Sequence, residues 1–335
     1  MLIDGPLYAQ LGEAREEAIR LRQLGYDGLY TLEGAGDPFL PLALAAEHCP
    51  GMTIATGIAV AFPRNPSHIA YQAWDLQRFS GGHFMLGIGS QVKAHIEKRF
   101  GVPFDAPARR MREYILAVKA FFDCWQSGER LDFQGEFFTH TLMTPMFNPG
   151  PLECGVPPIL LGAMGPRMTE VAGEVADGLI VHPFNTEAFL RDEQLPALKR
   201  GLADGADDFI VQVGAMCVTG TNEQEYAAAR QTIRGLLAFY GSTPAYLPPM
   251  RSIGYEALQP ELNALSKAGR WEEMTDLIDD RFLEAFAVCG EPDEVAAGLK
   301  ARYGSIATRL SIYAPYRLPD NAWQTMIGQL KEEQF

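Results

Sequence analysis

The sequence of 335 residues predicts a single α/β domain, a (β/α)₈ TIM barrel with insertions, over residues 1–335. Short apolar runs rich in β-branched residues alternate with amphipathic stretches, a pattern typical of parallel strands joined by crossover helices. The alternation reaches eight strands, the number that closes a barrel of this kind. A hydrophobic content of 47% at this length also allows a large core.

Each predicted strand is short and apolar, and helical periodicity follows it. The strands are Met1–Asp4, Gly28–Leu32, Thr53–Val60, Phe84–Gly89, Pro158–Leu161, Gly178–Val181, Ile210–Val218 and Ala307–Tyr313. The helices are Glu13–Leu24, Phe39–Glu47, Pro66–Phe79, Ala108–Trp125, Pro166–Ala176, Glu187–Ala203, Glu223–Tyr240, Asp293–Tyr303 and Ala322–Lys331. Gly25 follows the first helix and favours its termination there.

Two segments are predicted as insertions into this barrel. Residues 127–155 alternate polar and apolar residues around Gly135, which predicts a hairpin followed by a proline-rich loop. Residues 241–286 contain several prolines and then helical patterning, and they are too long for an ordinary loop. We expect this second insertion to cover or shape a substrate pocket.

Charge and cysteine content exclude several classes of partner and site. The formal net charge of −14 disfavours binding to nucleic acid or to an anionic membrane. The five cysteines are scattered without C-x-x-C pairs, so we expect reduced thiols and no metal site. The sequence shows neither a secretory signal nor an apolar run long enough to cross a bilayer. We therefore expect a cytoplasmic protein.

Active sites of such barrels are built from the loops that follow the strands. After the second strand, Glu33 would point into the mouth, where it could contact a cofactor or substrate. Asp37 precedes Pro38 and is predicted to cap the next helix. In the third strand, Gly57 indicates a bulge or a close backbone approach, although an ordinary buried strand remains an alternative.

After the fourth strand, Gly87 and Gly89 lack the third glycine of a dinucleotide-binding fingerprint. We interpret Gly89 as clearing room for a flat ring, which nearby polar side chains could contact. These side chains are Ser90, Gln91 and His95.

The fifth strand leads into small residues that open a helix, where free N–H groups, the helix dipole and a basic side chain favour a phosphate. The predicted phosphate-binding residues are Gly162, Ala163, Met164, Gly165, Pro166 and Arg167. The alternative is an ordinary glycine turn with proline at the first helical position. After the sixth strand, His182 would lie at the mouth as a contact or a stacking surface.

These residues occur within an ordered set of short motifs over Met1 to Pro183. The set comprises Leu24–Gly28, Asp37–Phe39, Ala55–Gly57, Arg64–Pro66, Leu76–Phe84, Leu86–Gly89, Arg110–Glu113, Pro157–Ile159, Gly165–Met168 and Ala176–Gly178. It resembles the luciferase-like flavin monooxygenases and the related oxidoreductases that use a deazaflavin, coenzyme F-420. The segment 89–101 resembles the deazaflavin branch most closely.

The resemblance implies a deazaflavin or flavin ring resting on a bulge of the third strand, at Thr56, Gly57 and Ile58. It also implies a non-prolyl cis peptide bond at Gly57–Ile58. Ser90, Gln91 and His95 would then contact the ring or its side chain, and Gly162 to Arg167 would hold the phosphate. Relatives commonly pair through barrel helices, so the resemblance further implies a homodimer.

The chain departs from the deazaflavin-dependent sugar-phosphate dehydrogenases that it resembles. Those enzymes carry an Asp-His pair after the second strand and a Glu after the fourth, where this chain has Leu32-Glu33 and Val92. Their substrate is therefore not carried over. Glu33, with His95 or His182 behind it, is our candidate for proton transfer, and a carboxylate in that role needs a pKa raised by burial.

We expect an oxidoreductase that transfers hydride between coenzyme F-420 and a small organic substrate. One alternative is an FMN-dependent monooxygenase supplied by a separate flavin reductase; oxygen consumption would distinguish it. A second alternative is a non-catalytic flavin-binding barrel, which would bind the cofactor without turnover.

Overall fold

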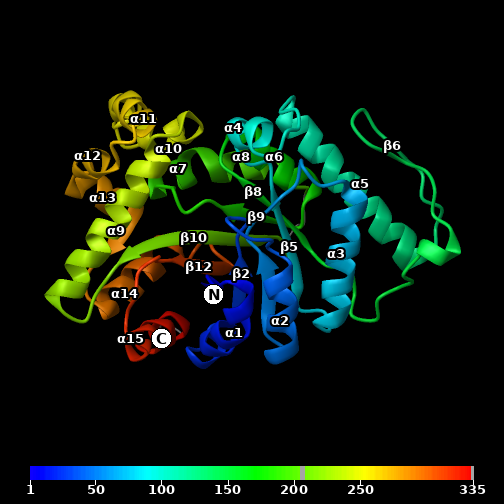
Figure 1. The fold of residues 1–335 in the computed structure, drawn as a ribbon, viewed down its shortest axis with the longest axis horizontal. Helices are drawn as coiled ribbons and strands as arrows, with labels where there is room; N and C mark the ends of the chain where they lie inside the picture. The colour runs from blue at the N-terminus through cyan, green and yellow to red at the C-terminus, as the bar shows by residue number, and fades with distance from the viewer. Residues whose placement is uncertain (204–207, 333–335) are drawn as a thin grey trace.

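The computed structural model describes residues 1–203 and 208–332, which form a ring of parallel strands surrounded by helices (Figure 1). The barrel strands are β1 Leu2–Pro6, β2 Gly28–Thr31, β3 Thr53–Thr56, β5 Phe84–Gly89, β8 Ile159–Ala163, β9 Gly178–Val181, β10 Ile210–Val218 and β12 Arg309–Tyr313. They pair in this order, and β12 pairs with β1 to close the ring. The predicted eight-stranded (β/α)₈ fold is confirmed.

The helices cover the outside of the strands, and both contribute to one apolar core. The main outer helices are α1 Ala14–Gln23, α2 Leu40–His48, α3 Pro66–Phe79, α5 Pro107–Ser127, α6 Pro166–Val175, α9 Glu223–Gly241, α14 Pro292–Tyr303 and α15 Asp320–Lys331. Local sequence sets several of their ends. The Asn65 side chain caps α3 by accepting the Ser67 N–H, and Gly128, with a φ of 75°, ends α5.

Some short elements differ from the sequence prediction. The predicted third strand is interrupted at Gly57–Ile58, and its end forms the separate strand β4 Ala59–Val60. The predicted helix over 187–203 consists of α7 Glu187–Phe189, a π-helical turn over Leu190–Gln194 and α8 Leu195–Gly201.

Two elements were not predicted. Helix α4 Lys93–Lys98 follows β5, and strand β11 Ala287–Cys289 pairs with the end of β10. Helix α4 spans six residues and β11 spans three, so neither carries enough periodicity to be recognised from sequence.

The first insertion contains the predicted hairpin, with β6 Phe133–Gln134 antiparallel to β7 Thr139–His140. The carboxylate of Glu113 on α5 accepts the backbone N–H groups of residues 136–138, at 2.7 to 2.9 Å. These bonds hold the hairpin against α5, outside the ring of strands (Figure 1).

The second insertion folds into short helices beside the carboxyl end of β10. They are α10 Leu247–Arg251, α11 Gln259–Lys267, α12 Trp271–Asp276 and α13 Asp280–Phe286, coloured yellow to orange in Figure 1. Phe282 and Phe286 stack with centroids 4.8 Å apart, and Phe184 stacks on Phe286 at 4.3 Å. The insertion thus has an apolar cluster of its own, joined to the barrel through the segment after β9.

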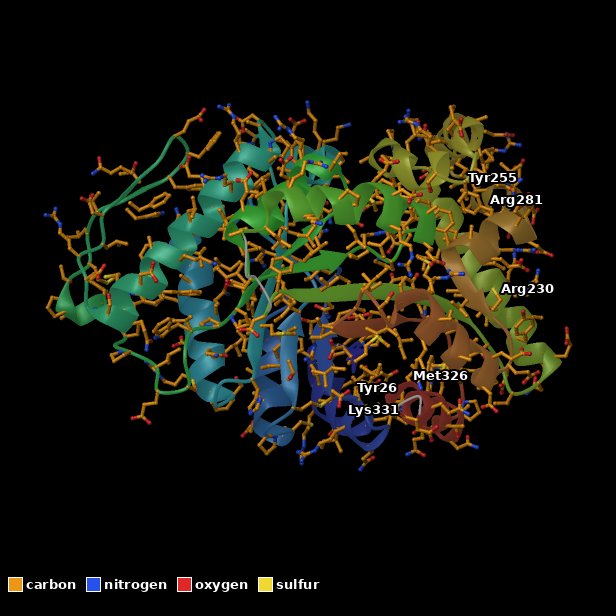
Figure 2. The ribbon with its side chains drawn as sticks, turned by 180° about the vertical axis from the view of Figure 1, so that it is seen from behind. Tyr26, Arg230, Tyr255, Arg281, Met326 and Lys331 are labelled. Atoms are coloured by element: carbon orange, nitrogen blue, oxygen red, sulfur yellow. The ribbon has the colours of Figure 1, made fainter. Side chains whose placement is uncertain are left out.

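Near the amino ends of the strands, the barrel encloses a buried ion pair. The Arg309 guanidinium on β12 binds the Asp4 carboxylate on β1, with Nε 2.8 Å from Oδ2. Gln212 of β10 donates to the Ser311 hydroxyl at 2.6 Å beside this pair. On the outside, Lys331 at the end of α15 binds Asp27 at 2.7 Å, so the last helix is held beside the first strands. Figure 2 shows Lys331 close to Tyr26, the neighbour of Asp27 in the chain.

No helix in residues 1–203 and 208–332 is long and apolar enough to cross a membrane. All five cysteines are free thiols.

Candidate active site

The cis peptide bond expected at Gly57–Ile58 is present, at the carboxyl end of β3. Backbone bonds fix this bulge to the neighbouring strand end. Gly57 donates to the Thr31 carbonyl at 2.6 Å, and Glu33 donates its N–H to the Ile58 carbonyl at 3.2 Å. These two hydrogen bonds hold the bulge in a fixed position at the barrel mouth.

The Glu33 side chain holds the far side of the same bulge. Its Oε2 accepts the Val60 N–H at 2.7 Å and the Arg64 guanidinium at 2.6 Å, and only 7% of the side chain is exposed. Arg64 also binds the Val60 carbonyl at 2.9 Å. The carboxylate thus already has two donors, and its role in proton transfer stays a prediction. Asp37 accepts the N–H groups of Phe39 and Leu40 at 2.8 and 3.2 Å. The predicted N-cap position is wrong, because α2 begins at Leu40 and its N-cap is Phe39, so Asp37 binds the turn just before the helix.

Small residues on β5 and β8 make room for the Ile58 side chain. A Cβ at Gly89 would lie 3.1 Å from Ile58 Cδ1, and a Cβ at Gly162 would lie 2.9 Å from Ile58 Cγ2. The space that we assigned to a ring above Gly89 is therefore occupied by Ile58. Ile58 itself is partly exposed, so it is the residue of the bulge that a flat ring could rest on.

Thr56 lies below this surface. The residue is fully buried, and its hydroxyl donates to the Gly87 carbonyl at 2.7 Å. The structure thus uses the Thr56 side chain to join β3 to β5 and does not bring it to the mouth surface.

The segment after β5 places Ser90 and Gln91 at the rim. Gln91 has a φ of 55°, in the left-handed region that non-glycine residues rarely adopt and that is frequent at functional sites. Its Oε1 accepts the Val92 N–H at 2.9 Å, and the Ser90 hydroxyl donates to the Gln91 carbonyl at 3.2 Å. His95 follows on α4, and its side chain is exposed.

The predicted phosphate turn leads from β8 into α6. Gly165 precedes the helix, Pro166 occupies its first position, and a Cβ at Gly165 would meet no atom within 4 Å. The first N–H groups of a helix have no partner within the helix, and no side chain caps them here. Arg167 lies exposed in the first turn, and within the described residues it has no ion pair. The turn is open and carries unpaired donors, as a phosphate site requires.

A buried amide pair supports this turn from below. Gln194 donates to the Ala163 carbonyl at 2.9 Å and accepts from Asn185 Nδ2 at 2.7 Å. Gln194 ends the π-helical turn, a feature that is frequent at functional sites. Sequence reasoning missed both residues, because their proximity to Ala163 arises only in the folded barrel.

His182 lies directly after β9, at the mouth as predicted. Its Nδ1 accepts the Phe184 N–H at 3.0 Å, so the neutral ring carries its proton on Nε2. That Nε2 faces the Tyr246 hydroxyl at 3.5 Å. Burial lowers the pKa of His182 to about 4, so the ring is uncharged at neutral pH.

Five tyrosines, which we call the mouth tyrosines, gather around His182 and the bulge. They are Tyr8, Tyr30, Tyr240, Tyr246 and Tyr313. The hydroxyls of Tyr240 and Tyr313 are 3.0 Å apart, and a Cβ at Gly57 would lie 3.0 Å from the Tyr30 ring. Burial raises the pKa of Tyr246 to about 12 and that of Tyr240 well above its usual value.

Sequence reasoning missed the mouth tyrosines. Tyr8 and Tyr313 stand at the carboxyl ends of the first and last strands, a position that could have identified them. Tyr240 and Tyr246 lie in a helix and in the insertion, and no local pattern places them at the mouth.

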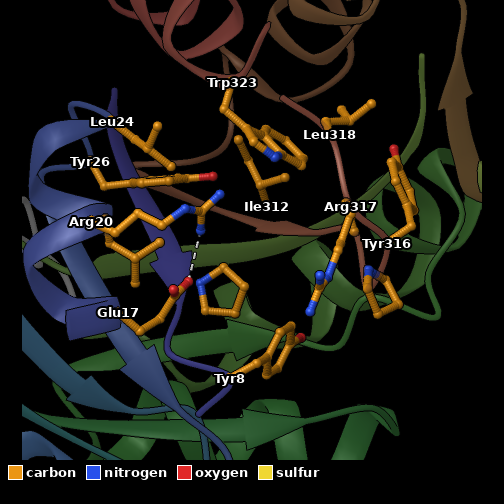
Figure 3. A pocket seen from close by; sticks show the side chains of 14 residues that line it. Tyr8, Glu17, Arg20, Leu24, Tyr26, Ile312, Tyr316, Arg317, Leu318 and Trp323 are labelled. Carbon is orange, nitrogen blue, oxygen red and sulfur yellow. Dashed lines mark hydrogen bonds and ion pairs between the residues drawn. The ribbon is translucent and has the colours of Figure 1, made fainter. Parts of the chain in front are cut away.

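Two grooves open beside this cluster and share Tyr8. One, of about 650 Å³, lies between α1, α15 and the ends of β1 and β12, and aromatic rings of Tyr26, Tyr316 and Trp323 line it (Figure 3). The Arg20–Glu17 ion pair in its wall is 2.8 Å long. The other, of about 710 Å³, lies between segments 7–13 and 31–41. Tyr8 is thus shared by the mouth tyrosines and by the walls of both grooves.

Among residues 1–203 and 208–332, no group of three or more His, Cys, Asp or Glu side chains could hold a metal ion. The polar groups at the mouth include backbone N–H groups, phenols, an imidazole, the Glu33 carboxylate bound to Arg64, and the side chains of Ser90, Gln91 and Arg167. Such a set can bind an anion and donate hydrogen bonds to an uncharged ligand.

Several known proteins resemble this chain over most of its length. A protein of uncharacterized function from Mycobacterium tuberculosis is 47% identical over 92% of both chains. The 5,10-methylenetetrahydromethanopterin reductase of Methanolobus tindarius is 26% identical over 87% of this chain and 83% of its own. A putative coenzyme F-420-dependent oxidoreductase of M. tuberculosis is 28% identical over 86% and 85%.

Solved structures share the fold at low sequence identity. The F-420-dependent tetrahydromethanopterin reductase of Methanopyrus kandleri superimposes with a TM-score of 0.79 at 20% identity, covering 98% of this chain and 97% of its own. An F-420-dependent secondary alcohol dehydrogenase, solved with an F-420–acetone adduct, gives 0.74 at 15%, covering 99% of both. The family model described as luciferase-like monooxygenase matches residues 3–309. The chain therefore belongs to the luciferase-like monooxygenase family.

Proposed function

We propose that this protein is an oxidoreductase that transfers hydride between coenzyme F-420 and a small organic substrate at the barrel mouth. The observation that carries the proposal is the pairing of the Gly57–Ile58 bulge with the open turn before α6. A cofactor that carries both a flat ring and a phosphate could place the ring on the bulge and the phosphate at the turn. Relatives named for F-420 or for tetrahydromethanopterin reduction support the deazaflavin over other cofactors.

The residues present fit such a cofactor. The uncapped N–H groups of α6 and the Arg167 guanidinium would hold its phosphate, because the helix dipole and the cation both favour an anion there. Ile58 would support the ring from below. When bound, the deazaflavin supplies the hydride chemistry, and the protein supplies binding and orientation.

The chain's own groups would bind the substrate above that ring. Two residues of the second insertion contact the segment after β9. The Tyr246 hydroxyl faces His182, and the Ser252 hydroxyl lies 2.7 Å from that of Thr186. These contacts hold the insertion beside His182, where it would close one side of the mouth and exclude water from the reacting atoms.

An FMN-dependent monooxygenase, supplied by a separate flavin reductase, is the second candidate. The description of the matching family favours it, and FMN also combines a ring with a phosphate. In that case the same bulge and turn would be used, and oxygen would be a substrate.

Isotope transfer separates the two. Reduced F-420 deuterated at C5 is mixed with the protein and a panel of small ketones, aldehydes and activated alkenes in the absence of oxygen. We expect deuterium to appear on carbon in the product. Product formation that requires oxygen and reduced FMN, with no deuterium transfer from F-420, would favour the monooxygenase.

A further inference from the structure

Two hydrogen-bond donors meet at the mouth with no strong acceptor between them. The His182 proton is on Nε2, because Nδ1 already accepts the Phe184 N–H. The contact of Nε2 with the Tyr246 hydroxyl, at 3.5 Å, is too long for a strong hydrogen bond. Within the described residues, no other side chain is bonded to the Tyr246 hydroxyl, so its own proton lacks an acceptor. An oxygen atom of a ligand could accept from both groups.

The surroundings of these donors are aromatic and uncharged. The His182 ring lies 4.9 Å from the Tyr246 ring at a tilt of 30° and 5.0 Å from the Tyr240 ring, edge to face. Phe184 packs against both tyrosines, at 5.8 Å. The pKa shifts of His182 and Tyr246 arise from burial, with a smaller contribution from Tyr313 and none from a charged side chain. Among the residues that the structure describes, aromatic rings lie against these two donors, so this place favours an uncharged ligand.

We propose, resting on the function proposed above, that His182 and Tyr246 bind the oxygen of an uncharged, flat carbonyl compound and that the protein works as its reductase. The aromatic rings would pack on the apolar body of this substrate. The two donors would polarise the carbonyl, in the way that a neutral imidazole acts as an electrophile in other enzymes.

The electron and proton balance of this reaction is simple. The reduced deazaflavin is the reductant, and its hydride forms the new C–H bond at the carbonyl carbon. The carbonyl π electron pair moves to the oxygen. The resulting alkoxide is a stronger base than a phenolate, so it takes the proton of the Tyr246 hydroxyl. The phenolate regains a proton from water, and the oxidised deazaflavin releases one to water. The sum is carbonyl plus reduced deazaflavin giving alcohol plus oxidised deazaflavin.

The same donors disfavour alcohol oxidation at neutral pH. That direction needs a base for the hydroxyl proton. The lone pair of His182 Nδ1 is occupied by the Phe184 N–H, and burial keeps the phenols protonated. Oxidation would therefore need an ionised phenol, and its initial rate should rise with pH while that of reduction stays nearly constant.

The first test measures binding without any cofactor. The protein labelled with ¹⁵N at histidine is titrated with acetophenone and, separately, with benzoate, which has the same phenyl body and a negative charge. We expect acetophenone to bind at least about 10-fold more tightly, because burying an unpaired carboxylate is costly. Its binding should shift the His182 Nε2 resonance. Equal binding of benzoate, or a proton on Nδ1, would overturn the proposal.

Variants assign the effect to the two donors. Tyr246→Phe removes one hydroxyl and should weaken acetophenone binding about 3- to 10-fold, the range of one net hydrogen bond. His182→Phe removes the other donor, whereas His182→Gln keeps a side-chain N–H and should retain most of the affinity. The matched control is Tyr255→Phe, because Tyr255 lies on the same insertion but donates to Asp279. Affinities unchanged in Tyr246→Phe and His182→Phe would contradict the assignment.

These outcomes separate the two proposals. If acetophenone binds as expected and F-420 does not bind, the hydride-transfer function fails and the carbonyl pocket stands. If F-420 binds and acetophenone does not shift the His182 Nε2 resonance, only the assignment of the carbonyl pocket fails, and the hydride-transfer function stands. Initial rates with F-420 then test direction: 1-phenylethanol oxidation that equals acetophenone reduction at neutral pH would overturn the reductase assignment.

Discussion

Glu33 and Arg64 form a pair that holds the bulge in place. The Glu33 carboxylate accepts from the Val60 N–H and from Arg64, and it lies on the chain segment next to Ile58. These contacts give Glu33 a positioning role, separate from any part in proton transfer. The two roles predict different results on substitution.

Glu33→Gln should lower the free energy of unfolding by about 1–3 kcal/mol, because hydrogen bonds to a charged group are replaced by weaker ones. It should also weaken F-420 binding, since the bulge loses its support. Urea unfolding and a fluorescence titration measure these effects. If Glu33 only positions the bulge, the pH profile of kcat keeps its shape in the variant; loss of one limb of that profile would instead identify a proton-transfer role.

His182 provides a pH-dependent contribution to stability. Its pKa in the folded protein is about 4, below the ordinary value of 6.5. As pH falls through this interval, the unfolded chain binds a proton and the folded protein does not, so the free energy of unfolding decreases. His182→Gln should therefore lose less stability than the wild type between about pH 7 and about pH 5. Urea unfolding at both pH values tests this, and equal losses in the two proteins would contradict the burial of a neutral ring.

At the residue scale, the sequence located part of the site. His182 and the α6 turn were predicted because each directly follows a strand. The mouth tyrosines were not predicted, since they come from five separate segments of the chain and meet only when the barrel closes. The role of Gly89 changed for a similar reason, because the side chain that fills its space is Ile58, from the bulge between β3 and β4.

Glycine at position 87 allows β3 and β5 to approach each other. A Cβ there would lie 1.9 Å from the Thr56 carbonyl oxygen and 2.7 Å from Ile180 Cδ1. Neither strand can shift freely, because Thr56 also bonds to the Gly87 carbonyl. This crowding sets the spacing of the strands that carry the bulge.

Gly87→Ala should lower the free energy of unfolding by about 3 kcal/mol, the upper part of the range for overpacked cores. The control Gly12→Ala, at a surface position where a Cβ meets nothing within 4 Å, should change it by less than about 0.5 kcal/mol. Thermal unfolding of both variants measures the difference. Equal stability of the two variants would show that the strands are not closely packed at Gly87.

At the element scale, the eight strands and their order could be predicted because apolar runs alternate with helices along the chain. A glycine within a β-branched strand indicated the bulge at Gly57, whereas the cis bond at Gly57–Ile58 followed from resemblance to a family. The π-helical turn over Leu190–Gln194 could not be predicted, because its apolar spacing differs little from that of an α-helix.

For the whole molecule, the barrel closes where the first and last strands pair, Leu2 opposite Arg309. The Asp4–Arg309 ion pair joins these two strands inside the barrel, and both residues are at most 6% exposed. Because a buried guanidinium without its carboxylate is costly, closure depends on both partners.

Asp4→Ala should lower the free energy of unfolding by about 3–5 kcal/mol. The double variant Asp4→Ala/Arg309→Met removes the unpaired charge and should recover part of that loss. Chemical unfolding of the two variants tests this expectation. A double variant that is less stable than Asp4→Ala would show that the buried charge is not the source of the loss.

The bulge and the α6 turn together form the proposed cofactor-binding site. Fluorescence titration of the protein with oxidised F-420 and, separately, with FMN at fixed salt tests it most directly. We predict that F-420 binds more tightly than FMN, and that Arg167→Ala weakens F-420 binding about 10-fold while the exposed control Arg15→Ala does not. Binding of FMN alone, or of neither cofactor, would contradict a deazaflavin-dependent hydride transfer at this mouth.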